Sequence, residues 1–160
     1  GCTGNSISDN SGTACADVYF YYLATECSME TQLTSLPTTS DCDDTCWNYC
    51  AGAGCDGYAV NSWRGHSGTI STTMEIGANG DIYNDYIVFH PPDNGIGFGE
   101  YSLNGQYTRF TGILGQAITD INGCDSFNWH VVIFVDGEAV FTSQQFTIKA
   151  QTESVDIDVT

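Results

Sequence analysis

From residue 69 onward, short apolar runs alternate with polar residues and are separated by turn-forming residues. A repeat of two residues is typical of strands with one buried side and one side in water. The turn-forming segments are residues 78–81, 91–95, 104–105, 122–123 and 136–137. The strands predicted between them are Thr69–Ile76, Asp85–His90, Gly97–Leu103, Tyr107–Gly115, Phe127–Val135, Ala139–Thr147 and Ser154–Val159. Short strands at this spacing favour a mainly β protein, folded as an antiparallel β-sandwich.

The strongest local signal in this pattern is a two-residue turn, Asp136 followed by Gly137. It separates the apolar runs Val131–Val135 and Ala139–Ser143. Glycine adopts positive φ without steric cost, which such a tight turn requires. We therefore expect these two runs to pair as a hairpin.

The first 68 residues follow a different pattern. Residues 1–14 are small and polar, and we expect an extended arm there. Asp17–Thr25 is apolar at successive positions, which predicts a strand covered on both sides. Asp41–Ala51 begins with acidic residues that can cap a helix and complement its dipole, so it predicts one short helix. Residues 15–68 are expected to pack as a cysteine-rich lobe on a sandwich formed by residues 69–160, as one compact unit.

Eight cysteines in a chain of 160 residues predict a disulfide framework formed in an oxidising compartment. If all of them pair, Cys124 must bond to a cysteine within residues 1–55, because the other seven precede residue 56. Zinc binding by four of the cysteines is the alternative, although their spacing lacks the usual C-x2-C pairs. The cysteines are Cys2, Cys15, Cys27, Cys42, Cys46, Cys50, Cys55 and Cys124, of which Cys42, Cys46, Cys50 and Cys55 would be the zinc ligands.

The side chains carry a strongly negative charge. Three Lys and Arg residues stand against 20 Asp and Glu residues, giving a net charge of -17. Such a surface repels phosphate backbones, which excludes nucleic acid as a partner and disfavours anionic membranes. No apolar run approaches the roughly 20 residues of a membrane-spanning helix. The remaining partner classes are divalent cations, cationic molecules and neutral ligands.

Several ordered motifs in the second half of the chain resemble the carbohydrate-binding module called NPCBM, over about residues 76–160. They are His90-Pro91, YTRFTGILG at residues 107–115, the Asp136-Gly137 turn and VDIDV at residues 155–159. The resemblance implies a jelly-roll-like sandwich that binds glycans and accompanies glycosidases and surface proteins. The family usually continues with another strand after the last motif. We therefore expect the edge beside residues 154–159 to be filled by the strand at 17–25, by a following segment or by another copy.

A second resemblance covers residues 42–61, CDDTCWNYCAGAGCDGYAVN. This segment is similar to the core of PAN/apple domains, in which a cysteine-bearing helix is joined to a following strand. That resemblance implies protein or glycan partners. The alternative is a disulfide-linked excursion with no function of its own.

Sugar binding needs exposed aromatic rings beside hydrogen-bonding groups, because the faces of a pyranose ring are apolar and its rim carries hydroxyls. The candidates are Tyr107, Trp129, Tyr101 and Trp63. Tyr107 follows the turn at residues 104–105 and is the best surface candidate. Trp129 begins an inward-looking strand, so burial competes with ligand contact.

Two further kinds of site are possible from residue type. Asn79, Asp81 and Asp85 provide side-chain oxygens suited to a structural Ca²⁺, with turn formation as the alternative. Thr38 and Thr39 follow a proline in a Ser/Thr-rich segment, which is typical of O-linked glycosylation. No other cofactor is expected.

Catalysis is not expected. The sequence GHSG at residues 65–68 lacks the frame of a nucleophile elbow, and the three histidines are far apart in sequence. No pair of carboxylates stands out as a glycosidase acid and base. We therefore expect a secreted or cell-surface module that binds glycans and assembles with copies of itself. The alternative is a structural subunit of an extracellular filament, built by strand complementation and without a role in sugar binding.

Overall fold

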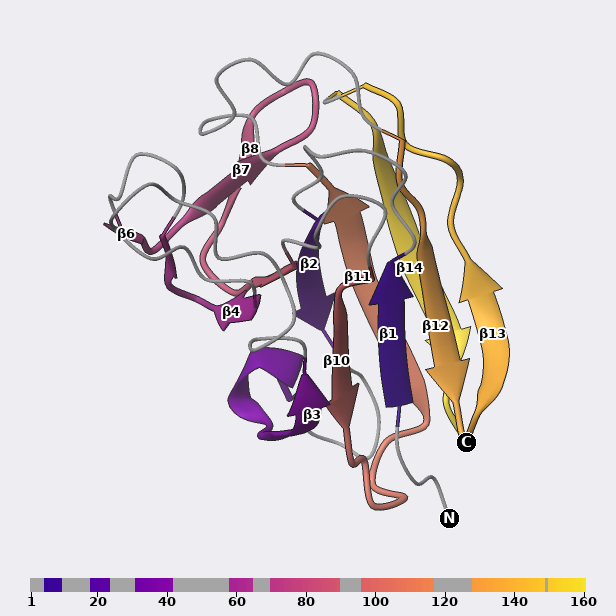
Figure 1. The fold of residues 1–160 in the computed structure, drawn as a ribbon. Helices are drawn as coiled ribbons and strands as arrows, with labels where there is room; N and C mark the ends of the chain where they lie inside the picture. Colours follow the sequence, from indigo (N-terminus) through magenta and orange to yellow (C-terminus); the bar gives the residue numbers. More distant parts are fainter. Residues whose placement is uncertain are drawn as a thin grey trace.

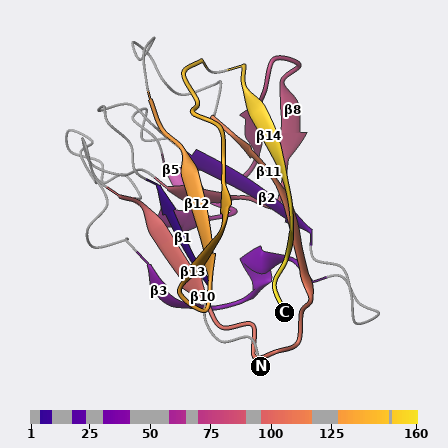
Figure 2. The ribbon, with the colours of Figure 1, turned by 90° about the vertical axis from the view of Figure 1, so that its right-hand side faces the viewer.

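Two antiparallel sheets of five strands each face one another in the computed structural model, which describes residues 5–9, 18–23, 31–41, 58–64, 70–89, 96–116, 128–148 and 150–160 (Figures 1 and 2). Sheet A has the order β13 (Glu138–Thr142), β12 (Val131–Val135), β1 (Asn5–Asp9), β10 (Phe98–Tyr101) and β3 (Thr38–Asp41). Sheet B has the order β14 (Thr152–Asp158), β11 (Arg109–Gly115), β2 (Val18–Leu23), β9 (Ile87–Phe89) and β4 (Tyr58–Val60). The expected mainly β, antiparallel sandwich is confirmed.

Smaller elements complete the described structure. β5 (Trp63–Arg64) pairs with β6 (Ile70–Ser71), and β7 (Met74–Ile76) pairs with β8 (Asp81–Tyr83). A 3-10 turn, η1, spans Leu33–Ser35. Among the described residues, no helix has the length and apolar character needed to cross a membrane.

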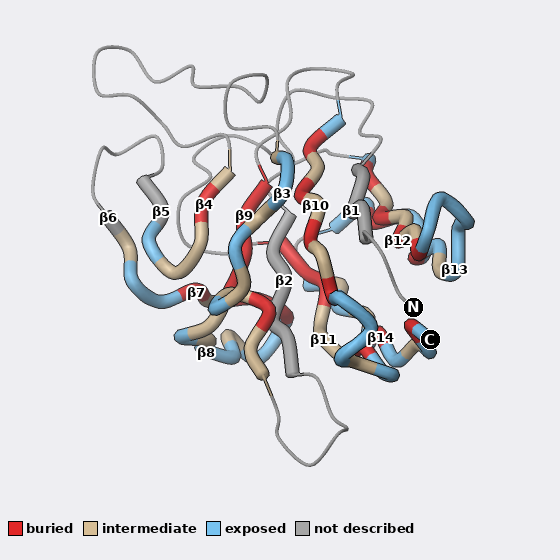
Figure 3. The backbone as a smooth tube through the Cα atoms, turned by 90° about the horizontal axis from the view of Figure 1, so that it is seen from below, coloured by how far each residue is buried: buried red, intermediate tan, exposed pale blue. Residues whose placement is uncertain are grey.

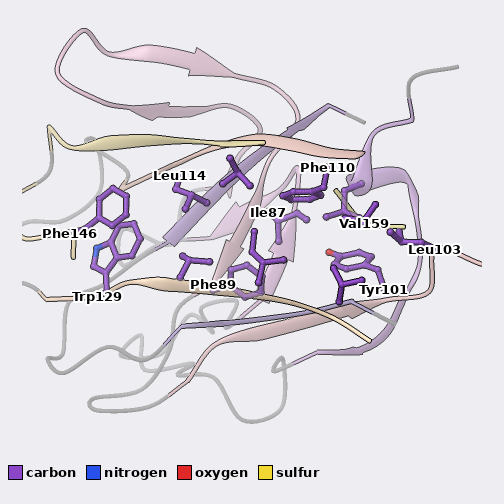
Figure 4. Close-up of a cluster of buried hydrophobic side chains, with 14 residues drawn as sticks. Ile87, Phe89, Tyr101, Leu103, Phe110, Leu114, Trp129, Phe146 and Val159 are labelled. Atoms are coloured by element: carbon purple, nitrogen blue, oxygen red, sulfur yellow. The ribbon is translucent and has the colours of Figure 1, made fainter. Parts of the chain in front are cut away.

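The sandwich core follows directly from the alternation in the sequence. In β12, Val131, Ile133 and Val135 are buried, while the two residues between them are partly exposed. Figure 3 shows the same contrast across the fold, with buried segments in the facing strands and a largely exposed edge strand β13. Figure 4 shows the core between the sheets, running from the Trp129–Phe146 pair at one end to Tyr101, Leu103 and Val159 at the other.

A second apolar cluster lies on the outer face of sheet B, under the β7–β8 hairpin. Met74 and Ile76 of β7 are buried there together with Ala59, Tyr86 and Val88. This second cover explains why all three residues of β9 are buried: Ile87 and Phe89 belong to the sandwich core and Val88 to the outer cluster. A strand whose two faces are both covered can be apolar at every position, as β9 is.

The hairpin lies close to sheet B at Gly115. A Cβ atom built on Gly115 would be 3.0 Å from Ile76 Cδ1 and 3.2 Å from Thr152 Cγ2. Gly115→Val is therefore expected to push the hairpin away from the sheet and to lower the free energy of unfolding by about 1–3 kcal/mol, measured in urea. Ser154→Val, at an exposed position of β14, is the matched control. Equal stability of the two variants would contradict this close packing.

The expected strand Thr69–Ile76 is divided in the structure, and β8 was not expected. Hydrogen bonds at Ser71 and Thr73 explain the division of this strand. The Ser71 hydroxyl donates to the Thr73 carbonyl over 2.8 Å, and the Tyr86 hydroxyl donates to the Ser71 carbonyl over 2.6 Å. These side-chain bonds bend the chain between β6 and β7, where the sequence alternation alone predicted continuity. The other predicted strands are present, most of them with shorter bounds, whereas β13 begins one residue earlier than predicted, at Glu138, and β14 begins two residues earlier, at Thr152.

The predicted hairpin at Asp136 and Gly137 is confirmed: β12 pairs with β13, and the two turn residues have φ of 51° and 85°. Asn104 and Gly105 adopt nearly the same conformation, with φ of 50° and 65°. There, however, the turn leads from β10 in sheet A to β11 in sheet B. The same turn chemistry therefore joins paired strands in one place and crosses between layers in the other.

The N-terminal strands lie inside the sheets. β1 pairs with β10 and β12, and β2 pairs with β11 and β9. One expectation was that the strand at residues 17–25 fills the edge beside residues 154–159. It does not, because β11 lies between β2 and β14 in sheet B. No described strand pairs with the outer side of β14. Residues expected to form an arm and a lobe thus contribute β1 to β4 to the same two sheets as residues 69–160.

The predicted helix and the disulfides cannot be placed on this fold. Beyond Asp41, which ends β3, the helix segment lies outside the described residues, and so do all eight cysteines. Of the PAN/apple-like segment 42–61, the described part is β4 with Asn61. These features stay predictions. What the fold adds is that residues 42–57 connect the edge strand of sheet A to the edge strand of sheet B.

Candidate glycan-binding surface

Two of the four aromatic residues proposed for sugar binding are buried. Trp129 has 0% of its surface exposed and stacks on Phe146, with ring centroids 3.9 Å apart and planes 5° apart. Tyr101 is 1% exposed and belongs to the same core. A ring face that is covered by protein is not open to a sugar in solution, so both residues act in packing.

The other two candidates do not form a surface together. Tyr107 is half-buried and packs against the sandwich core. Trp63 lies in β5, where it pairs with Ser71, away from the two main sheets. The four residues predicted from the sequence are therefore spread over the core, a crossing loop and a small separate ladder.

A pair of tyrosines links the two sheets beside β3 and β4. The hydroxyls of Tyr58 and Tyr101 lie 2.5 Å apart, and the Tyr58 ring packs against Phe89 with centroids 5.5 Å apart. Burial raises the pKa of Tyr58 to about 12, with the nearby Asp41 charge adding to the effect. Burial, followed by the neighbouring Tyr58, raises the pKa of Tyr101 further. Both phenols stay protonated at neutral pH, so the pair provides a hydrogen-bonded link between the layers.

The residues proposed for Ca²⁺ lie at the two ends of β8. Asp81 begins this strand and Asn79 precedes it in the turn, while Asp85 follows it. The Asp85 carboxylate accepts weak hydrogen bonds from Thr34 Oγ1 at 3.5 Å and Asn61 Nδ2 at 3.4 Å. Within the described ranges, no three His, Cys, Asp or Glu side chains come together as a metal site. Asp85 thus orders neighbouring loops in the arrangement observed.

The two threonines proposed for glycosylation lie on the edge strand β3. Thr39 is exposed, and its hydroxyl donates to the Glu100 carbonyl over 3.2 Å. Thr38 is half-buried and donates to Asp41 Oδ2 over 2.9 Å. Both hydroxyls therefore have hydrogen-bond partners within sheet A, and sugar attachment at these positions stays a prediction.

The structure assembles a different surface, on the outer face of sheet A. In β10, Gly99 and Tyr101 are buried and face the core, and the half-buried Phe98 and Glu100 alternate with them, which places both on the opposite side of the strand, although part of the Phe98 side chain also packs against the core. In β12, the buried residues alternate in the same way with Val132 and Phe134. We call the surface formed by Phe98, Glu100, Val132 and Phe134 the aromatic face.

The strand register fixes the layout of the aromatic face. β1 lies between β10 and β12, so Phe134 shares a row with Ser6 and Glu100, and Val132 shares the next row with Ser8 and Phe98. Two strand spacings and one step of two residues separate the phenylalanines, about 12 Å between their Cα atoms. The two rings thus lie diagonally across a surface long enough for a short oligosaccharide.

The chemistry of the aromatic face suits a neutral ligand with apolar and hydroxylated sides. The half-buried phenylalanine rings offer apolar contact, and the Glu100 carboxylate accepts hydrogen bonds from hydroxyls. The sequence alone did not predict this surface because the strand between β10 and β12 comes from residues 5–9. The outward alternation of Phe98 and Glu100 was the available signal.

Comparison with known proteins places most of the chain in a described family. Residues 51–160 match the family model described as the NPCBM/NEW2 domain, beginning earlier than the resemblance in the sequence suggested. This earlier start includes β4, a strand of sheet B. The chain also matches the crystal structure of a DUF4425 family protein from Bacteroides ovatus, with 10% sequence identity, coverage of 100% of this chain and 98% of that one, and a TM-score of 0.36. No curated protein matches.

Proposed function

Because the chain belongs to the NPCBM/NEW2 family of carbohydrate-binding modules, we propose that it is a non-catalytic module that binds glycans through the aromatic face. The observation that supports this site is the register of sheet A, which sets Phe98 and Phe134 diagonally across one outer face with Glu100 beside them. A rigid sheet holds such groups in fixed positions, and this lowers the entropy lost on binding.

The charge of the chain selects among glycans. With a net charge of -17, the protein repels uronic acids and sulfated sugars, and Glu100 on the binding face adds to that repulsion. A neutral polysaccharide is not repelled by the negative charge of the protein, and it still offers apolar ring faces and hydroxyls. We therefore take neutral polysaccharides as the ligand class, and a secreted or cell-surface location as the setting in which the protein meets them.

Phe134→Ala is expected to weaken binding to a neutral polysaccharide about tenfold, because it removes one ring of the aromatic face. Glu100→Gln keeps the shape of the side chain and is expected to weaken binding less. The measurement is affinity electrophoresis of the intact chain in gels containing xylan, β-glucan or galactomannan, with alginate as the anionic comparison.

Ile82→Ala is the matched control, because Ile82 is 67% exposed on β8, an element of the hairpin that covers sheet B. It removes exposed apolar surface away from the aromatic face and should leave migration unchanged. Unfolding curves of all variants separate lost binding from lost folding. Retardation that persists in Phe134→Ala, or that is strongest in alginate, would contradict the proposed site.

The structural-subunit alternative keeps one observation in its favour. The polar strand β1 occupies a central place in sheet A although it comes from the N-terminal part of the sequence. Under this second proposal, copies of the chain assemble outside the cell by exchanging a strand, with or without sugar binding.

A further inference from the structure

The strand β1 joins parts of sheet A that are distant from it in the sequence. It lies between β10 and β12, as Figure 1 shows, and pairs antiparallel with both. Its residues Asn5 to Ser8 have partners in β10 and Asn5 to Asp9 have partners in β12. Without β1, sheet A would therefore have a slot bounded by two strands with unpaired backbone groups.

The composition of β1 is unusual for a central strand. Its sequence is NSISD, in which Ile7 is the one apolar residue. Asn5 is in register with the buried Val135 and Tyr101, and Asp9 with the buried Val131. Polar residues at core register positions gain little free energy from burial, so backbone pairing supplies most of the stability of this strand. Ile7 is the one apolar residue in register with core positions, and a strand with so little apolar surface is weakly specified and prone to exchange between chains.

The core-facing positions of the two strands that flank the slot carry no charged residue. Val131, Ile133 and Val135 bound it on the β12 side, and all three are buried. On the β10 side lie Gly99 and Tyr101, also buried. Exposing these groups and two rows of backbone donors and acceptors to water is costly, so an emptied slot favours any extended segment that restores the same pairing.

We propose that β1 is an exchangeable strand, and that the slot between β10 and β12 accepts Asn5–Asp9 from a second copy of this chain. The exchanged strand makes the same contacts as the original one, so closed and exchanged forms differ mainly in which chain supplies the strand and in the entropy of association. A reciprocal exchange closes as a dimer, whereas a head-to-tail exchange propagates as a filament. The proposal rests on the second proposed function, assembly of copies of the chain, and it does not depend on glycan binding.

The negative charge of the chain makes the predicted strand exchange depend on ionic strength. Two copies at -17 each repel one another, and about 0.15 M salt limits that repulsion to roughly 8 Å. Exchange should therefore increase with ionic strength. Pairing through the outer edge of β14 is a poorer route, because Glu153 and Asp158 would bring further acidic groups into the contact.

The test uses the full chain over a range of concentrations, in low and 0.5 M salt, with molar mass measured by light scattering. Oligomers are expected to increase with concentration and salt. A tenfold excess of a synthetic peptide of residues 1–14 should compete for the slot and reduce the oligomer fraction at least severalfold. The same peptide carrying Ile7→Pro is the control, since proline removes a backbone donor and should not compete.

A second measurement needs no variant, so it still tests the proposal if a variant fails to fold. Two differently labelled populations of the full chain are mixed, and the appearance of mixed oligomers is followed over time. Asp9→Val, which makes the strand more apolar, is expected to slow this mixing. A chain that stays monomeric under all conditions overturns the proposal, as do oligomers that the peptide of residues 1–14 leaves unchanged.

Discussion

Trp129→Ala is expected to lower the free energy of unfolding by about 3–5 kcal/mol. Trp129 is completely buried and stacks on Phe146 at one end of the sandwich core, as Figure 4 shows. The substitution leaves a large cavity between the two sheets. The sheets cannot easily move together to fill it, because backbone hydrogen bonds between neighbouring strands hold them in place. Urea unfolding of the intact chain, followed by circular dichroism, measures the loss.

Trp129→Phe separates packing from the indole nitrogen. Phenylalanine keeps a flat ring against Phe146, and it removes the buried Trp129 Nε1, which has no hydrogen-bond partner among the described residues. The loss of stability should therefore be clearly smaller than for alanine. Affinity for polysaccharides in the folded Trp129→Phe protein should be unchanged. A variant that keeps its unfolding midpoint but loses sugar binding would return Trp129 to the list of ligand contacts.

The stability of the protein is expected to decrease as pH rises above 10. The pKa of Tyr58 is raised from 10.0 to about 12 in the folded protein, and the pKa of Tyr101 is raised further. Above pH 10 the unfolded chain releases these protons while the folded chain retains them, so each further pH unit favours unfolding. For the fully buried Tyr101 the slope is about 1.4 kcal/mol per pH unit.

Urea unfolding at pH 8, 10 and 11 measures this dependence, and Tyr101→Phe provides the comparison. That variant has no phenol at the buried position and leaves the Tyr58 hydroxyl without its partner. We expect it to lose about 1 kcal/mol at pH 8 and to show a shallower decline above pH 10. Parallel declines in the two proteins would show that the tyrosine pair does not control alkaline unfolding.

The sequence predicted the kind of site, a non-catalytic surface with aromatic residues, but not which residues form it. Residue type and charge predicted a non-catalytic protein and left divalent cations, cationic molecules and neutral ligands as partner classes, with aromatic residues as the candidates for sugar contact. Each candidate was judged by its local sequence, and two of the four, Trp129 and Tyr101, are buried in the core. Trp129 looked equally suited to surface and core until the stack with Phe146 showed which face of the strand it occupies.

The aromatic face shows why the remainder could not be predicted. Phe98 and Phe134 lie in strands that are distant in sequence, and the strand that sets their spacing comes from residues 5–9. A polar pentapeptide gives no sign that it will occupy the centre of a sheet. Its position is decided by backbone pairing with β10 and β12, which carries no signature in side-chain pattern.

Local chemistry determined the elements of this protein and tertiary packing determined their partners. The alternation in Val131–Val135 and the turn at Asp136 and Gly137 were sufficient for a hairpin, because a two-residue turn fixes both strands at short range. The turn at Asn104 and Gly105 has the same backbone conformation, yet it crosses between sheets, because Arg109–Gly115 finds better partners in β14 and β2 than in β10. Sequence pattern specifies which residues are buried, whereas the neighbours they are buried against depend on contacts between segments far apart in the chain.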